Sequence, residues 1–263
     1  MSTRKAGFNK YLQVFLTFFF LVLGWQVIVA LLKIPDWILP SPADVIATLI
    51  KTWGIAISKN AIVTTKIILG GFGIAVIVGI PLGLAITSSE VFTRSAYPVI
   101  VFFQLIPKIA LGPLFVIWMG FDYKPRLLLT FLMCFFPIVV NSIVGFASIS
   151  EDVRRLSLSM GSKGFASFIK IKLPSALPTI FAGLKLSAIS ATIGAIVAEF
   201  IGASDGLGYL LLVAKGDLDT KLFFAVLIVL VLIGLAFFFT IELVERITIP
   251  WHISKRGVGE KLA

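Results

Sequence analysis

The chain has 263 residues, of which 59% are hydrophobic and 14% charged, with a formal net charge of +10. A soluble domain carries about 25% charged residues, so this composition excludes a water-soluble fold and indicates a protein that has the lipid bilayer as its solvent. The basic residues lie between apolar runs, which fits orientation in a membrane and not nucleic-acid binding. One cysteine, Cys134, and one histidine, His252, exclude an intrachain disulfide and a histidine-rich metal site.

Six apolar runs are long enough to cross a hydrocarbon core of about 30 Å as helices. Two of them contain one lysine each, Lys108 and Lys185. In chain order the runs are Tyr11–Leu32, Ile67–Ser89, Ser95–Phe121, Leu127–Ser150, Leu173–Ala198 and Leu222–Ile241. The first run lacks a small-residue cleavage site, so we interpret it as an uncleaved span. The sequence therefore predicts an all-α membrane protein with six transmembrane helices and both termini on one side.

A short helix is expected between the first and second runs. Ser41 has the character of an N-cap and Pro42 that of a first-turn residue. The apolar residues within Val45–Ile50 then fall on one face, which predicts a helix lying on the outer surface and not a seventh span.

The second and fifth runs each carry a small residue at every fourth position, which lets another helix approach closely. These ribs serve either ordinary helix packing or a sliding motion between helices. Their members are Gly71, Ala75, Gly79 and Gly83 in the second run, and Gly183, Ser187, Ala191 and Ala195 in the fifth.

The segment Ser150–Pro178 is the long polar interruption of the chain. Ser150 can cap a first short helix that stops at Gly161, and a second begins at Ser162. We expect Pro174 to end that second helix and Pro178 to start the next span. The pattern predicts two short helices at an angle, serving either as a membrane-surface connector or as a knob that enters a partner protein's groove. Basic residues are clearly more numerous on the side of this loop and the termini than on the other side, which predicts that this side is cytoplasmic.

Gly161 followed by Leu173-Pro174 resembles the cytoplasmic loop of permease subunits of bacterial ATP-binding-cassette (ABC) importers. That family's pattern is Glu-Ala-Ala, three residues, Gly, then about a dozen residues to Leu-Pro, and this chain departs from it by having Arg155-Leu156-Ser157 at the first triplet. The resemblance implies that the loop forms coupling helices in a cleft of a cytoplasmic ATPase. It also implies the contact residues, which are Leu158, Ser159, Met160, Gly161, Ser162, Lys163 and Gly164.

Further motifs resemble the subgroup that serves nitrate, sulfonates, taurine and pyrimidine precursors of thiamine. They are Leu39–Pro42, Gly79–Leu84, Pro107–Leu114 followed by Trp118–Phe121, and Gly206–Leu210. The Pro-Lys form at Pro107-Lys108 leans toward thiamine-precursor or flavin-type members.

The resemblance implies a type I importer permease fold in a bacterial inner membrane, with both termini cytoplasmic. Residues 1–60 would form the N-terminal tail, first span and outer helix, residues 61–248 the transmembrane core, and residues 249–263 a cytoplasmic tail. The implied partners are ATPase subunits, which hold ATP and Mg²⁺, an extracytoplasmic substrate-binding protein and a second permease subunit, favoured as a homodimer. No cofactor is expected on this chain itself.

Four polar residues within the runs are candidates for the transport pathway. Lys108 lies mid-run between Pro107 and Pro113, so we expect a broken helix there, with the lysine either lining the pathway or playing a structural part. Gln104 precedes it by four residues, on the same helical face. Asn141 either lines the pathway or forms an interhelical hydrogen bond, and Glu199 either pairs with a cation or faces the pathway.

Lys185 lies nearer the cytoplasmic end of its run, where we expect it to snorkel toward water.

No catalytic constellation is found in the sequence. It contains no Gly-x-x-x-x-Gly-Lys-Ser/Thr phosphate loop, no His-Glu-x-x-His and no Gly-x-Ser-x-Gly. We therefore expect that the chain is not an enzyme and has no catalytic or metal-binding residues. We expect instead the permease of an ATP-driven importer for a small polar or anionic solute. That solute would be a thiamine pyrimidine precursor, a riboflavin-like compound, nitrate, a sulfonate or taurine. The alternatives are an ATPase-independent channel or secondary carrier and a membrane-embedded enzyme.

Overall fold

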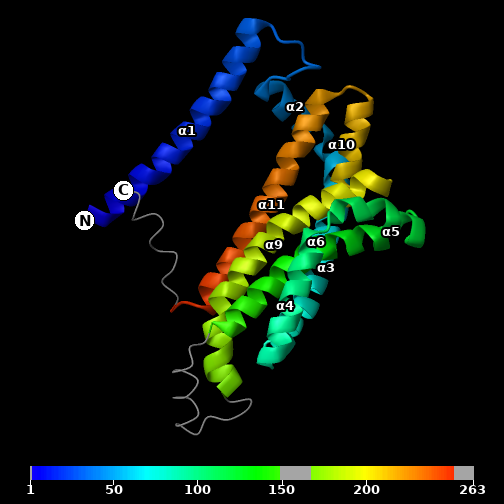
Figure 1. Cartoon of the computed structure of the whole chain (residues 1–263). Helices are drawn as coiled ribbons and strands as arrows, with labels where there is room; N and C mark the ends of the chain where they lie inside the picture. The colour runs from blue at the N-terminus through cyan, green and yellow to red at the C-terminus, as the bar shows by residue number, and fades with distance from the viewer. Residues whose placement is uncertain (1, 149–166, 252–263) are drawn as a thin grey trace.

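The computed structural model describes residues 2–148 and 167–251, and all regular structure within these ranges is helical. Figure 1 shows the arrangement of the helices. The α-helices are α1 (Ser2–Leu32), α2 (Pro42–Thr52), α3 (Ser58–Ile86), α4 (Glu90–Leu105), α5 (Gly112–Met119), α6 (Tyr123–Ala147), α9 (Leu173–Gly202), α10 (Leu207–Gly216) and α11 (Thr220–Thr248). Two π-helical turns, Trp53–Ile57 and Phe168–Lys172, and one 3₁₀ turn, Lys108–Leu111, adjoin them.

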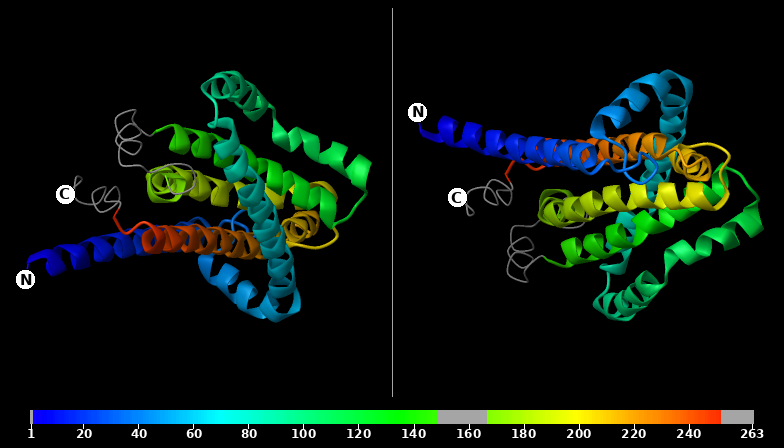
Figure 2. Two further views of the ribbon diagram at one scale, coloured as in Figure 1. Left: turned by 90° about the horizontal axis from the view of Figure 1, so that it is seen from below. Right: turned by 90° about the horizontal axis from the view of Figure 1, so that it is seen from above.

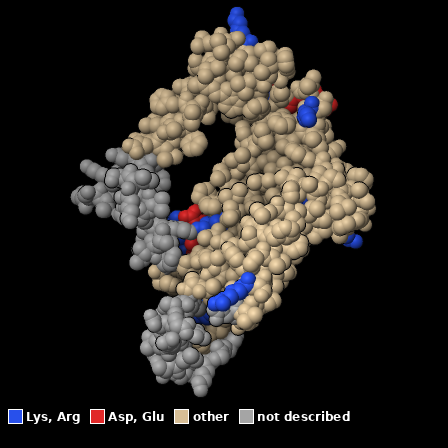
Figure 3. All heavy atoms as spheres, viewed as in Figure 1, with Lys and Arg blue, Asp and Glu red and all other residues tan. Residues whose placement is uncertain are grey.

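The described helices agree with the six predicted spans. Five helical segments are long and apolar enough to cross a membrane, and α4 with α5 forms a sixth if this pair, bent by 73° at its break, is counted as one span. The break falls at Lys108, as the two flanking prolines predicted. On the face seen in Figure 3, charged side chains appear only in isolated groups among the described residues, as expected for a surface that faces lipid.

The predicted helix between the first two spans is present as α2. The Ser41 hydroxyl accepts a hydrogen bond from the Asp44 amide at 3.1 Å, which confirms the N-cap. The predicted single apolar face is wrong in part, because Val45 is buried against α10 and α11 whereas Ile46 and Ile50 are exposed. Helical structure also continues from α2 through the π-helical turn into α3, so that Pro42–Ile86 is one segment of 45 residues.

Helix α6 packs against both α3 and α9, and Figure 2 shows α3 crossing over the other two. The small-residue ribs of α3 and α9 lie at their contacts with α6. A Cβ atom on Gly71 of α3 would lie 2.6 Å from Thr130 of α6. On the other side, a Cβ atom on Gly183 of α9 would lie 2.5 Å from Asn141. The small residues therefore allow α6 to pack closely against both neighbours, which confirms the packing role of the ribs.

Replacing Gly71 by valine should lower the thermal unfolding midpoint of the detergent-solubilised protein by roughly 2–12 °C, because overpacking a tight contact costs about 1–3 kcal/mol. Gly73 on the same helix has no atom within 4 Å of its would-be Cβ, so Gly73→Val is the matched control and should leave the midpoint close to that of the unchanged protein. Equal shifts for the two variants would show that helix propensity, and not the contact with α6, sets the effect.

The structure corrects the predicted start of the fifth span. Pro174 does not end a helix and Pro178 does not begin one, because helical structure runs without interruption from Ser167 to Gly202. Pro174 directly follows the π-helical turn Phe168–Lys172, where the regular i→i−4 hydrogen-bond pattern is already interrupted, so its missing amide does not end the helix. Pro178 lies inside α9 and removes one backbone hydrogen bond without ending the helix.

Helix α1 is anchored to the rest of the chain near its C-terminal end. Val29 is buried, and the Trp25 ring lies 5.7 Å from that of Phe224 on α11. Asp36, just after α1, pairs with Lys221 at the start of α11 at 2.6 Å. Toward its N-terminus α1 diverges from the other helices (Figure 1), so its exposed apolar residues face lipid or another protein in a membrane.

Candidate functional site

Lys108 stabilises the break between α4 and α5. Its ammonium group donates a hydrogen bond at 2.8 Å to the carbonyl oxygen of Gln104, in the last turn of α4, and lies 4.9 Å from the centroid of the Phe136 ring. The last carbonyls of a helix have no partner within the helix, so the lysine satisfies a backbone group that the break leaves open. It is half-buried, and part of the ammonium group therefore remains accessible.

Two sequence predictions about the pathway candidates are corrected by these contacts. Gln104 and Lys108 do not share a helical face, because α4 ends at Leu105 and the lysine reaches back to the backbone of Gln104. Asn141 makes no interhelical hydrogen bond among the described contacts. Its side-chain amide donates at 2.8 Å to the carbonyl of Pro137 on the same helix, while its Cβ packs against Gly183.

Glu199 is fully buried and caps the N-terminus of α10. Its Oε1 accepts a hydrogen bond from the Thr64 hydroxyl at 2.8 Å, and its Oε2 accepts one from the Gly208 amide at 2.6 Å. A carboxylate is favoured at a helix N-terminus because the amide groups point outward and the helix dipole is positive there. The sequence predicted that Glu199 pairs with a cation or faces the pathway. In the described part of the chain, no cation lies at hydrogen-bond distance from Glu199, and its side chain faces no open pathway.

Thr64 and Asn60 of α3 complete the cap at the N-terminus of α10. The Leu207 amide donates to the Thr64 hydroxyl at 2.8 Å, and the Gly206 amide donates to Asn60 Oδ1 at 2.7 Å. Three successive amides at the start of α10 are thus bound by side chains of α3 and α9. We call Asn60, Thr64, Glu199 and the amides of Gly206–Gly208 the α10 cap.

The glycines of the α10 cap are required by the closeness of the carboxylate. Gly206 has a φ of 104°, and a Cβ atom there would lie 2.3 Å from the carboxyl carbon of Glu199. A Cβ atom on Gly208 would lie 2.8 Å from the Cβ of Glu199. The close approach of the Glu199 side chain therefore explains the two glycines of the Gly206-Leu207-Gly208 motif.

An ion pair that sequence reasoning missed lies next to the α10 cap. Arg126 on α6 donates to Asp205, just before α10, at 2.5 Å, and the arginine is buried while the aspartate is half-exposed. The sequence places Arg126 in the connection between the runs Ser95–Phe121 and Leu127–Ser150, where a basic residue by itself indicates only topology. The signal that could have revealed the pair is an acid in the connection after the fifth run, at the same end of the bundle.

Lys185 does not snorkel, as the sequence suggested, but forms a buried ion pair with Glu245 of α11 at 2.7 Å. Both side chains are about nine-tenths buried, at 11% and 6% exposure. The prediction failed because the sixth run was ended at Ile241, whereas α11 continues to Thr248 and brings Glu245 against α9.

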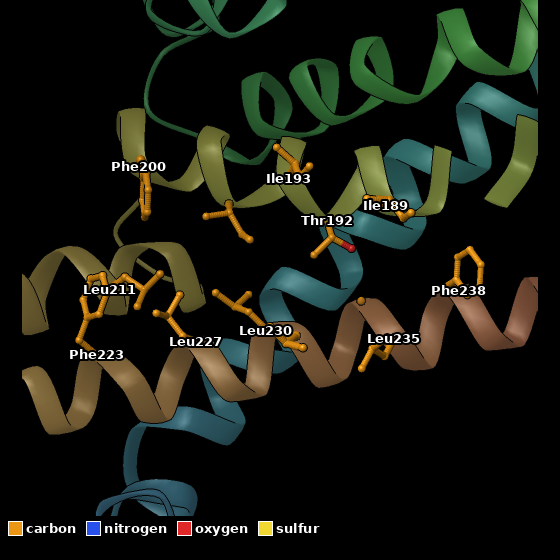
Figure 4. A pocket seen from close by; sticks show the side chains of 13 residues that line it. Ile189, Thr192, Ile193, Phe200, Leu211, Phe223, Leu227, Leu230, Leu235 and Phe238 are labelled. Atoms are coloured by element: carbon orange, nitrogen blue, oxygen red, sulfur yellow. The ribbon is translucent and has the colours of Figure 1, made fainter. Parts of the chain in front are cut away.

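A groove of about 640 Å³ lies between α9, α10 and α11 (Figure 4). Thr192 is the one polar side chain among its described lining residues, and its hydroxyl is already bonded to the carbonyl of Ala188. Figure 4 shows apolar side chains such as Leu227 and Phe238 pointing from α11 toward α9. The groove therefore suits hydrocarbon and offers nothing to a polar solute.

The predicted ATPase-contact residues, 158–164, lie outside the described residues, so their role stays a prediction from the sequence. Within the described ranges, no group of three or more His, Cys, Asp and Glu residues could hold a metal ion.

Comparison with known proteins identifies the family. The family model described as "Binding-protein-dependent transport system inner membrane component" matches residues 75–249. The formylaminopyrimidine transport permease protein ThiX of Halalkalibacterium halodurans is 34% identical over 238 residues, which are 90% of this chain and 95% of that protein. The riboflavin transport system permease protein RibX of Chloroflexus aurantiacus is 32% identical over 242 residues, 90% and 89% of the two chains. The taurine transport system permease protein TauC of Escherichia coli is 28% identical over 235 residues, 87% and 85% of the two chains.

The family match extends from the middle of α3 to the end of α11 and covers more than half of the chain. Membership implies a multi-pass membrane protein that works with an ATPase and a substrate-binding protein. The chain therefore belongs to the binding-protein-dependent transport system inner membrane components, and it is an ABC importer permease of the sulfonate, taurine and thiamine-precursor group, not an enzyme.

Proposed function

We propose that this permease imports a heteroaromatic solute of the thiamine-pyrimidine or flavin type, in preference to nitrate, sulfonates or taurine. The observation that carries the proposal is the similarity, over 90% of the chain, to permeases named for formylaminopyrimidine and riboflavin. Two copies of the chain would form the pathway in a bacterial inner membrane, with both termini in the cytoplasm. The excess of basic residues on the side of the termini supports this orientation.

Within the pathway, we assign solute contact to Lys108 with Gln104 and Asn141. All three are at least partly accessible in this protomer. An ammonium group carries three donors, and the hydrogen bond to the Gln104 carbonyl uses one of those of Lys108. Carbonyl or anionic oxygens of a solute are suited to the others. Glu199 is left out of this set because its side chain is fully buried in the α10 cap.

Uptake into proteoliposomes tests the proposal. The permease is reconstituted with its ATPase and binding protein, and the uptake of radiolabelled formylaminopyrimidine, riboflavin and taurine is compared with and without internal ATP. We expect ATP-dependent uptake of one of the two heteroaromatic compounds. Uptake without ATP would indicate a channel or secondary carrier, and ATP-dependent uptake of taurine alone would refute the substrate class.

The segment 158–164 is proposed to transmit the ATPase's motion. Replacing Gly161 by valine should abolish ATP-driven uptake but leave the folded permease in normal yield, because a β-branched residue disfavours the left-handed conformation proposed for this helix stop. Size-exclusion chromatography checks folding and the proteoliposome assay checks transport. Transport by the variant at the normal rate would remove the coupling role from this residue.

A further inference from the structure

The contact between α9 and α11 is uneven along its length. In the middle, the apolar groove of about 640 Å³ that Figure 4 shows opens beside the contact of the two helices, where a Cβ atom on Gly234 of α11 would lie 3.4 Å from Thr192 of α9. At one end of the groove they are joined through α10, whose Leu211 packs with Val226 and Leu230 of α11. Beyond the other end they are joined by the Lys185–Glu245 ion pair at 2.7 Å.

The ion pair lies in the half of α9 that follows directly on the segment 149–166. Helical structure is continuous from Ser167 through Lys185, so a displacement at the start of α9 can reach this lysine along one helical segment. Glu245 lies in the last turn of α11, and Ile249 just beyond it is buried in the same core cluster as Ala176 of α9. The α10 cap at Glu199 is 14 residues further along α9, about 21 Å away at the rise of an α-helix.

Stability alone does not account for a lysine and a glutamate at this place. Charged residues within a span are disfavoured, and exchanging a buried ion pair for well-packed apolar residues is often neutral or stabilising. What the ion pair provides, and an apolar contact does not, is a short directional bond that holds two helices in one register. Apolar contact is non-directional, so by itself it fixes the register of two helices less strictly.

We propose that Lys185 and Glu245 are positioning residues for transport, which make α11 follow α9 when the ATPase moves the segment before α9. The inference rests on the proposed coupling of that segment to the ATPase. It goes further in naming α11 as the element that receives the motion and in naming the two side chains that carry it.

The test measures solute transported per ATP hydrolysed in the reconstituted complex. The double variant Lys185→Met/Glu245→Leu removes both charges of this ion pair together, so neither of the two is left buried without the other. We expect normal yield, an unfolding midpoint close to that of the unchanged protein and retained ATP hydrolysis, with transport per ATP reduced roughly 10-fold. Lys185→Arg keeps an ion pair and should retain at least half of the normal ratio. Glu242→Gln, which removes an exposed pair with Arg246 on the same helix, is the matched control and should not change it.

A folded double variant with a normal ratio overturns the proposal, since the ion pair would then be structural only. If the double variant does not fold, the exchanged variant Lys185→Glu/Glu245→Lys and Lys185→Arg decide. A normal amount of solute transported per ATP in either of these two variants supports the proposal. A 10-fold lower amount per ATP in both variants, with folding intact, overturns it. Failure of the proposed function is distinguishable, because the unchanged complex would then show no ATP-driven transport at all.

Discussion

Replacing Glu199 by alanine is expected to destabilise the permease by about 3–5 kcal/mol, which corresponds to a fall of roughly 6–20 °C in the unfolding midpoint. The change leaves the Thr64 hydroxyl and the Gly208 amide without their acceptor in a fully buried place. Each unsatisfied buried group costs about 1–3 kcal/mol, and the lost carboxylate also leaves a cavity. Thermal unfolding in detergent, followed by tryptophan fluorescence, measures the effect.

Two further variants define the cause. Glu199→Gln keeps one acceptor but turns an amide donor toward either Thr64 or Gly208, so an intermediate loss is expected. Glu242→Ala removes an acid that pairs with Arg246 on the exposed side of α11 and should change stability by less than about 1 kcal/mol. If Glu199→Ala unfolded within 2 °C of the unchanged protein, the α10 cap would not be holding the helices together.

Gly206→Ala is expected to destabilise the protein by about 2–5 kcal/mol although it adds a single methyl group. About 1–2 kcal/mol comes from placing an L-residue at a positive φ, here 104°. Overpacking contributes about 1–3 kcal/mol more, because the added Cβ would lie 2.3 Å from the carboxyl carbon of Glu199.

Gly216, at the last position of the same helix, is the control for Gly206. A Cβ atom there meets nothing within 4 Å, so Gly216→Ala should be neutral or slightly stabilising. The comparison of the two unfolding midpoints is the measurement. A loss of the same size in both variants would mean that the glycines matter for chain flexibility and not for the approach of Glu199.

The apolar runs alone predicted much of this fold. Six runs correspond to the described spans, with α4 and α5 counted as one, and the break at Lys108 follows from the two prolines beside it. The cap at Ser41 and the small-residue ribs that face α6 were also predictable. These features depend on length, hydropathy and residue spacing within one segment, which the chain carries locally.

Short helices and polar contacts were harder to predict. α10 has ten residues, too few to stand out as a span, and its first amides are satisfied by side chains of other helices. Lys185 was assigned to water because the end of α11 was placed too early for Glu245 to reach it. The sequence predicts a helix stop at Pro174, whereas a π-helical turn just before it lets the helix continue, and no local pattern distinguishes the two outcomes.

The residue pattern alone was enough to predict a membrane-spanning chain, the position of its long apolar helices, the break at Lys108, and the helix faces that pack closely. The partners of the buried polar residues became clear from the folded chain, because Thr64 and Glu199 are 135 positions apart, and Lys185 and Glu245 are 60 apart. In lipid a buried polar group must find its partner within the protein. The helix ends and crossing angles choose that partner, and no local pattern encodes them.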